Sequence, residues 1–267
     1  MIFDTHTHYD DKRFDGEREE LLRSLPSEGI GRIAAVAADL KSSRAALRIA
    51  EEYPFACAVI GIHPDCVSEA ETLGEAAAAA LKALARHERC AAVGEIGLDY
   101  HGEDIYPDKV PRPVQKKWFK RQLELMKEAS LPGVIHSRDA AEDTLNIIRE
   151  AGGKDFSLVH HCFGYGKEMA KLYLDMGHYL GIGGVMTYKN GRKLKEVVQY
   201  MPLDRILLET DCPYLAPEPF RGRRNDSRML PYVTAEIARL KGTEPEEIER
   251  ITWENAMRFF RLKEENA

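Results

Sequence analysis

Met1-Ile2-Phe3-Asp4-Thr5-His6-Thr7-His8 is the stretch of sequence that decides the fold class. Its apolar start, Ile2–Thr5, predicts a buried β-strand that runs directly into His-Thr-His. An open doubly wound sheet would lead us to expect a glycine-rich phosphate-binding turn at this place. The histidines favour a closed barrel of parallel strands, in which strand ends carry catalytic side chains.

Seven further β-leaning segments follow, and helical patterns separate them. Near-continuous apolar runs are typical of parallel strands buried on both faces. Eight βα units in 267 residues predict an α/β fold, a (β/α)8 TIM barrel, in one domain over residues 1–267. The expected strands are Ile2–Thr5, Arg32–Ala37, Cys57–Ile62, Ala91–Ile96, Gly133–His136, Leu158–His161, Tyr179–Ile182 and Ile206–Glu209. The expected helices include Glu17–Glu28, Arg44–Glu52, Leu73–His87, Val114–Ala129, Ala141–Glu150 and Lys167–Met176.

The composition indicates a folded protein outside the membrane. A hydrophobic share of 44% and a charged share of 31% are ordinary for a globular domain, and no apolar run has the length of a membrane span. The N-terminus shows no secretion leader, because the predicted first strand begins at once. The five cysteines are scattered, odd in number and without a Cys-x-x-Cys pair, which favours a reducing compartment. We therefore expect a cytoplasmic protein, a monomer without an obligate protein partner.

The net charge of −6 restricts any role in nucleic-acid binding. A protein that holds nucleic acid through bulk electrostatics needs a surplus of lysine and arginine on one face. This chain has no such overall surplus. Contact with DNA would therefore be local, through metal ions that bind one phosphate and a few nearby arginines.

Side chains that bind metals fall at the ends of five predicted strands. The carboxyl ends of barrel strands meet at one mouth, so these side chains are expected to converge there. Imidazole and carboxylate groups suit Zn²⁺, Mn²⁺ or Mg²⁺. The candidates are His6 and His8, Glu95 and Asp99, His136, the neighbours His160 and His161, and Asp211.

The number of candidate ligands favours two divalent metal ions. Five or six ligands are more than one catalytic ion usually takes, whereas two ions about 3.5–4 Å apart and bridged by a carboxylate use them all. His6 and His8 point the same way from one strand, and Glu95 is the expected bridge. Such a pair serves the in-line hydrolysis of phosphodiesters, in which Asp211 would also take the proton of the attacking water.

Several strings of this sequence resemble those of the TatD-like deoxyribonuclease family. The likeness runs from residue 3 to about 262, including the closing segment Trp253–Leu262 with Asn255-Ala256. Together the strings are highly specific. They are Phe3–His8, Gly61–Pro64 (Gly-Ile-His-Pro), Gly94–Tyr100 (Gly-Glu-Ile-Gly-Leu-Asp-Tyr), Ile135–Ala140 (Ile-His-Ser-Arg-Asp-Ala), His161–Phe163 (His-Cys-Phe), Glu209–Pro217 and Arg221–Asn225.

The resemblance implies a (β/α)8 fold, divalent metals and a 3′-to-5′ exonuclease or DNA-repair-type activity. It also selects His161, the histidine before Cys-Phe, over His160. The metal ligands that it implies are His6, His8, Glu95, His136, His161 and Asp211. Three features depart from the family's pattern: Asp65 where a second histidine is common, Asp226-Ser227 after the arginines, and a long loop after Tyr100.

Substrate contacts are expected from loops at the same mouth. Guanidinium groups suit phosphate oxygens, although each arginine fits a plain surface charge equally well. The Tyr100 ring could stack on a base, but packing within the protein is the safer expectation for it. His63 fits a phosphate contact and a buried structural histidine equally well, while Asp99 and Glu209 are expected to orient ligands or arginines. The candidate contacts are His63, Tyr100, Arg138, Arg221, Arg223 and Asn225.

The expected activity is thus hydrolysis of DNA at 3′ ends or in single strands, with Glu95 and Asp211 as catalytic groups. A D-aminoacyl-tRNA deacylase or a phosphomonoesterase would use the same metals. A cyclic amidase with a carbamoylated lysine bridge is disfavoured, because Glu95 stands in that position. The other alternative is a catalytically silent binding protein on this fold, against which the intact ligand set argues.

Overall fold

Eight parallel strands form one sheet in the order of the sequence, β1 to β8, in this computed structural model, which describes residues 1–106 and 108–263. The last residues of the predicted domain range 1–267 lie outside the described part. The strands are β1 (Ile2–Thr7), β2 (Ile30–Val36), β3 (Ala56–Ile60), β4 (Cys90–Asp99), β5 (Gly133–Arg138), β6 (Leu158–His160), β7 (Tyr179–Ile182) and β8 (Ile206–Leu208).

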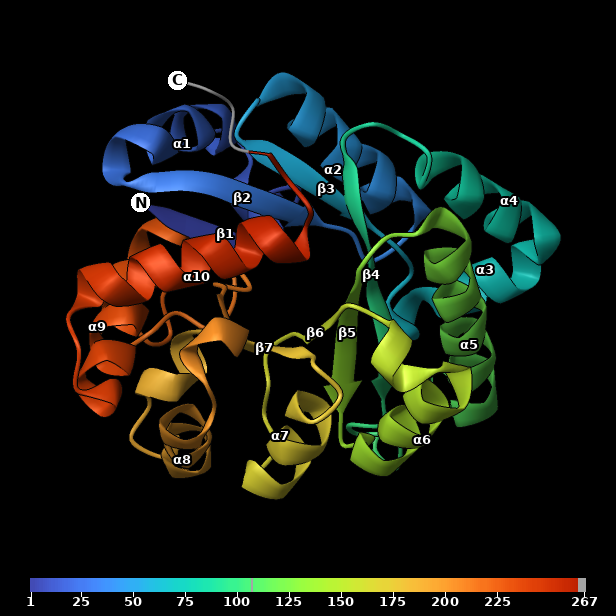
Figure 1. Cartoon of the computed structure of the whole chain (residues 1–267). Helices are drawn as coiled ribbons and strands as arrows, with labels where there is room; N and C mark the ends of the chain where they lie inside the picture. Colours follow the sequence, from blue (N-terminus) through green and yellow to red (C-terminus); the bar gives the residue numbers. More distant parts are fainter. Residues whose placement is uncertain (107, 264–267) are drawn as a thin grey trace.

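Helices surround this sheet on the outside, as Figure 1 shows. Apolar side chains of strands and helices fill the layer between them. No helix in the described ranges combines the length and the hydropathy that crossing a bilayer requires. The helices are α1 (Arg18–Ser24), α2 (Leu40–Glu52), α3 (Val67–Leu73), α4 (Glu75–Leu84), α5 (Arg112–Ala129), α6 (Ala141–Ala151), α7 (Lys167–Leu174), α8 (Arg192–Tyr200), α9 (Leu230–Lys241) and α10 (Pro245–Phe259).

The barrel closes where β1 meets the segment after β8. The Asp211 amide donates to the His6 carbonyl at 3.0 Å, and the His8 amide donates to the Cys212 carbonyl at 2.9 Å. Further along the same seam, the Thr5 hydroxyl donates to the Leu208 carbonyl at 2.8 Å. The predicted (β/α)8 barrel is therefore confirmed, and its closing seam carries three of the predicted metal ligands.

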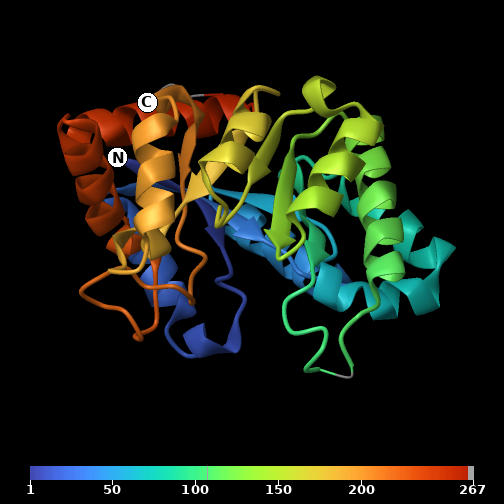
Figure 2. The ribbon, with the colours of Figure 1, turned by 90° about the horizontal axis from the view of Figure 1, so that it is seen from below.

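One end of the barrel is sealed by α10. The ring of Phe259, its last residue, meets Tyr179 of β7 edge-on at 5.5 Å between centroids. The ring of Phe260, the next residue, stacks on Phe3 of β1 at 5.4 Å. These rings pack with inward-facing strand residues in a second apolar cluster. Figure 2 shows α10 in red at this end and the loops after β1, β4 and β8 at the opposite end. The functional mouth is therefore the end away from α10.

Several element boundaries differ from those predicted. The helix expected over Leu73–His87 is divided at Gly74, whose positive φ of 54° ends α3 and starts α4 in a new direction. The helix expected over Glu17–Glu28 tightens into a 3₁₀ turn at Leu25–Glu28, which contains Pro26. Strand β4 continues to Asp99, so Glu95 lies within the strand rather than at its end.

Candidate metal centre

Glu95 lies at the centre of the mouth, and its two carboxylate oxygens face different groups of side chains. Oε2 lies 3.4 Å from His6 Nε2 and 4.0 Å from His8 Nε2. Oε1 lies 2.7 Å from His136 Nδ1 and 3.0 Å from His161 Nε2. The Glu95 side chain is buried, being only 5% exposed. One carboxylate thus joins two sets of imidazoles, which is the arrangement expected of a bridging ligand.

The first set contains His6, His8 and Asp211 beside Glu95 Oε2. The His6 and His8 Nε2 atoms are 3.2 Å apart, and Asp211 Oδ1 lies 3.8 and 3.2 Å from them. Four donors bound to one zinc-sized ion at about 2.0–2.2 Å would be about 3.3–3.6 Å apart in a tetrahedron. The donor atoms of this set are close to that spacing, so the residues fit a divalent cation.

The second set contains His136 and His161 beside Glu95 Oε1. His63 joins it, with Nε2 at 3.8 Å from Oε1 and its ring edge-on to His136 at 4.3 Å. Donor atoms of His63, Glu95 and His136 lie within 4.8 Å of one another, which is close enough to hold a cation. The six predicted ligands therefore gather in one cluster, and His63, a candidate phosphate contact, adds an imidazole beside His136.

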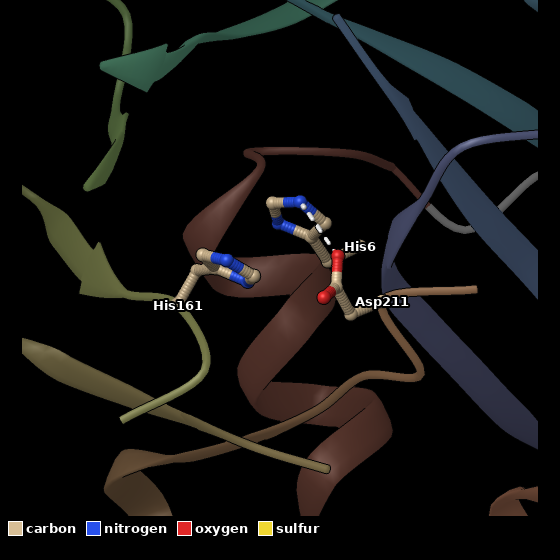
Figure 3. A group of neighbouring side chains, drawn as sticks. All are labelled: His6, His161 and Asp211. Carbon is tan, nitrogen blue, oxygen red and sulfur yellow. Dashed lines mark ion pairs between the residues drawn. The ribbon is translucent and has the colours of Figure 1, made fainter. Parts of the chain in front are cut away.

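His6 and His161 connect the two sets. Their rings stack with centroids 3.7 Å apart, and both have donor atoms within 4.8 Å of Asp211. Figure 3 shows Asp211 pointing toward His6, with His161 beside them. A second carboxylate therefore lies between the halves of the cluster.

The carboxylates and imidazoles of the cluster shift one another's pKa values. Burial alone would raise the pKa of Glu95, but His161, His63 and His6 around it hold that pKa well below its ordinary value. Burial likewise opposes the charged form of His161, while Glu95 and Glu209 raise its pKa well above the usual value. Glu95 is therefore ionised at neutral pH, and its charge favours cations.

The backbone at the mouth is unusual at one predicted ligand and directly after another. Asp211 has a φ of 57° and Cys162, next to His161, has a φ of 44°, in the left-handed region that costs non-glycine residues about 1–2 kcal/mol. Glu209 stabilises the second turn: its Oε1 accepts the Cys162 amide at 2.5 Å and lies 3.5 Å from His161 Nδ1. Gly181 leaves the space for this carboxylate, which any side chain there would overlap.

Asp99 contacts the ring nitrogen of His136 that does not face Glu95. His136 Nε2 lies 3.0 Å from Asp99 Oδ2, while Nδ1 faces Glu95. Asp99 is itself buried at 3% exposure. This is the orienting role expected for Asp99, because a carboxylate on one ring nitrogen sets which nitrogen is free to bind a metal.

A cavity of about 500 Å³ opens above the cluster. Arg138, predicted to contact phosphate, lines it, as do His63 and Tyr214. Tyr214 lies three residues after Asp211 in the β8 loop. Tyr214 was not among the predicted contacts, although its position in the loop after β8 was the available signal.

Four expected substrate contacts lie differently. Tyr100 is only 6% exposed, and its hydroxyl donates to Asp143 at 2.8 Å. Asn225 is fully buried and donates to the Thr210 carbonyl at 2.9 Å. These two side chains therefore make contacts within the protein and do not line the described cavity. The exposed Arg221 and Arg223 pack over the rings of Tyr188 and Phe220 and do not line the described cavity.

His160 points away from the cluster. Its Nε2 lies 3.1 Å from His178 Nδ1, and its ring stacks on Tyr173 at 3.5 Å. Burial lowers its pKa well below the ordinary value, so it stays neutral. The structure thus places His160 among core side chains, as the resemblance implied, and gives His178 a partner that the sequence did not reveal.

Without bound cations, the stability of the protein is expected to fall between pH 6.5 and 9. Burial lowers the pKa of His8, but Asp211 and Glu95 outweigh burial and raise it to about 9, above the ordinary 6.5. Protonated His8 contributes its full stabilisation below pH 6.5 and loses it as the pH rises through 9. The free energy of unfolding should therefore fall by up to about 3 kcal/mol over this range. Urea unfolding of EDTA-treated protein at pH 6 and 9 measures it. His8→Gln should flatten this dependence, and an unchanged slope would contradict the assignment.

Comparisons with known proteins agree with this geometry. The TatD related DNase family matches residues 3–261. The uncharacterized metal-dependent hydrolase YabD of Bacillus subtilis (strain 168) is 43% identical over 262 residues, covering 98% of this chain and 100% of that protein. The 3′-5′ ssDNA/RNA exonuclease TatD of Cronobacter sakazakii is 32% identical, covering 97% of each. The crystal structure of YjjV, a TatD homologue from Escherichia coli K12, has a TM-score of 0.88 at 28% identity, covering 98% of each chain. The chain therefore belongs to the TatD related DNase family and is a metal-dependent hydrolase acting on ester bonds.

Proposed function

We propose that this hydrolase is a 3′-to-5′ exonuclease that removes nucleotides from single-stranded DNA with the help of two divalent cations, Mg²⁺, Mn²⁺ or Zn²⁺. The observation that carries the proposal is the position of Glu95, whose two oxygens face two sets of imidazoles. A pair of bridged cations is suited to in-line displacement at phosphorus. The name of the Cronobacter sakazakii relative, a ssDNA/RNA exonuclease, supports the class of substrate.

The residues of the cluster divide into holding and reacting groups. His6, His8 and Asp211 would hold one cation, and His136 and His161 the other, with Glu95 shared between them. When bound, the cations would supply positive charge to phosphate oxygens and make hydroxide available near neutral pH.

Asp211 is the group proposed to accept the proton of the attacking water. Burial opposes ionisation of Asp211, but His8 and His161 lower its pKa, so the carboxylate is ionised at neutral pH. Its side chain keeps 18% exposure, so solvent reaches it. Arg138 at the rim would bind a phosphate oxygen of the strand, because guanidinium suits such oxygens.

Tyr214 is proposed to stack on the terminal base. Its ring is 46% exposed and lies 6.4 Å from the His8 ring between centroids. On one side, the Arg13 guanidinium lies 3.9 Å from the ring centroid, and Asp11 holds that guanidinium through two hydrogen bonds. The tyrosine is thus supported close to the cluster, as the stacking of single-stranded bases requires.

Tyr214→Ala should raise the KM for single-stranded oligonucleotides by about fivefold to a hundredfold, with little change in kcat. The expected range follows from the stacking energy of about 1–3 kcal/mol per base. Steady-state kinetics on a labelled oligonucleotide would measure it. Tyr232→Ala is the matched control, because Tyr232 is 44% exposed and packs against Phe220. An unchanged KM in Tyr214→Ala would remove Tyr214 from the binding site.

The proposed activity is tested by product analysis. Purified protein with Mg²⁺ or Mn²⁺ should release 5′-mononucleotides progressively from the 3′ end of single-stranded DNA. Blocked 3′ ends should slow the reaction, and aminoacyl-tRNA and phosphomonoesters should remain uncleaved. Release of amino acid from D-aminoacyl-tRNA, with intact DNA, would replace this proposal by the deacylase alternative.

We also propose that the chain acts as a monomer in the cytoplasm. All five cysteines are free, and three of them, Cys57, Cys90 and Cys212, are buried. Unpaired cysteines are typical of a reducing compartment.

A further inference from the structure

Two departures from the family's pattern meet beside the metal centre. Asp65 stands where the family often has a second histidine, and Lys109 belongs to the long loop after Tyr100. Lys109 Nζ lies 2.7 Å from Asp65 Oδ1 and 2.9 Å from Asp99 Oδ1. The lysine therefore bridges two carboxylates that would otherwise face each other without a cation between them.

Lys109 is the outer end of a chain of contacts that leads to Glu95. Asp99 holds Lys109 through Oδ1 and His136 Nε2 through Oδ2, the latter at 3.0 Å. His136 Nδ1 then lies 2.7 Å from Glu95 Oε1. The Lys109 side chain is 13% exposed and that of Asp99 is 4% exposed. Water screens such buried charges poorly, so each contact in the chain constrains the next.

A glutamine fixes the two ends of the loop. Gln115 of α5 donates from Nε2 to the carbonyls of Asp99 and Val110, both at 2.9 Å, and accepts the Asp99 amide at 2.8 Å. The backbone of Asp99 is therefore held without Lys109. The Asp99 side chain also accepts the His101 amide on Oδ1 at 2.9 Å. Lys109 adds a positive charge beside that same oxygen, while the other oxygen, Oδ2, meets His136.

We propose that Lys109, held by Asp65, is a positioning residue for the second half of the metal centre. By fixing Asp99 it makes His136 donate from Nε2 and present Nδ1 to a cation beside Glu95. The loop after β4 thereby sets the affinity of this half for metal. This role depends on the metal dependence of the family and is independent of which ester the enzyme hydrolyses.

The test uses two background variants, each of which lacks one ligand of one half of the cluster, so that the effect of Lys109 on the other half is measured by itself. A His8→Gln variant keeps His136, His161 and Glu95, and a His136→Gln variant keeps the first set. Metal-free proteins are titrated with Mn²⁺ by calorimetry, so the measurement does not depend on activity. Lys109→Met should raise the Kd of the His8→Gln protein about 10-fold, the lower end of the usual cost of losing an outer partner of a metal ligand, because Lys109 acts one contact further out, through Asp99.

In the His136→Gln background, Lys109→Met should change the Kd less than about twofold, because the lysine acts through His136. Lys195→Met is the matched control, since Lys195 pairs with Glu236 at 3.0 Å between α8 and α9 and is also partly buried. Equal losses in both backgrounds would show a general structural effect and overturn the proposal. No loss in the His8→Gln background would overturn it as well.

Asp65→Asn keeps the proposal testable if Lys109→Met fails to fold. The Asp65 side chain is 44% exposed, so its pair with Lys109 is weak and the expected rise in Kd is at most about fivefold, again only in the His8→Gln background. Combined with Lys109→Met, it should add nothing further. Additive losses, or a Kd unchanged by Asp65→Asn alone, would contradict the action of Asp65 through Lys109.

Discussion

Glu95→Ala should abolish hydrolysis, with kcat/KM falling at least about a thousandfold, while the protein stays folded. Both halves of the cluster depend on this one carboxylate, whose oxygens face His6 and His8 on one side and His136 and His161 on the other. Losing it would remove several kcal/mol of transition-state stabilisation by bound cations, and each 1.36 kcal/mol is a factor of ten.

The controls for Glu95→Ala separate chemistry from folding. Circular dichroism and thermal unfolding without metal check the fold, and Glu254→Gln, an exposed glutamate on the sealing helix α10, should retain full activity. Metal analysis of Glu95→Ala should show fewer bound ions than the wild type. Near-wild-type turnover in Glu95→Ala would refute the bridging role.

Removal of metal with EDTA should stop cleavage, and added Mn²⁺ or Mg²⁺ should restore it. The same treatment should lower Tm by about 10 °C, because a ligand present at a thousand times its Kd stabilises the fold by about 4 kcal/mol. After the metal has been removed, His8 is protonated at neutral pH, because Asp211 and Glu95 raise its pKa to about 9 against the effect of burial. A charged His8 then lies beside the carboxylates of Glu95 and Asp211.

Activity and Tm should return together when metal is added back. Differential scanning fluorimetry and a nuclease assay on the same samples follow both. The Tm of the His6→Gln variant should respond less to metal than that of the wild type. Full activity after exhaustive chelation would exclude the two-metal mechanism.

The cluster was predictable because parallel strands have a fixed direction. His6 lies near the end of the first strand and His8 follows it, His136 lies near the end of the fifth and Asp211 follows the eighth. Closing the barrel therefore brings them to one mouth whatever the details of packing. The choice between His160 and His161 was not predictable from spacing, because adjacent residues alternate in direction and the end of β6 decides which one faces inward.

Contacts that depend on loop conformation were beyond the sequence. Lys109 meets Asp65 and Asp99 only through the path of the loop after β4, and nothing in the local pattern indicates that path. The same limit left open whether Tyr100 stacks on a base or packs within the protein. Its hydroxyl bonds to Asp143 of α6, an interaction between distant elements, whereas Tyr214 stays exposed at the rim.

Glu95 is proposed to bridge two cations. A crystal of the protein grown with Mn²⁺, with diffraction recorded at the manganese absorption edge, would locate them. Two anomalous peaks are expected about 3.5–4 Å apart, one on each side of the Glu95 carboxylate. Absence of manganese beside Glu95, or ions bound only elsewhere on the protein, would contradict this bridging role.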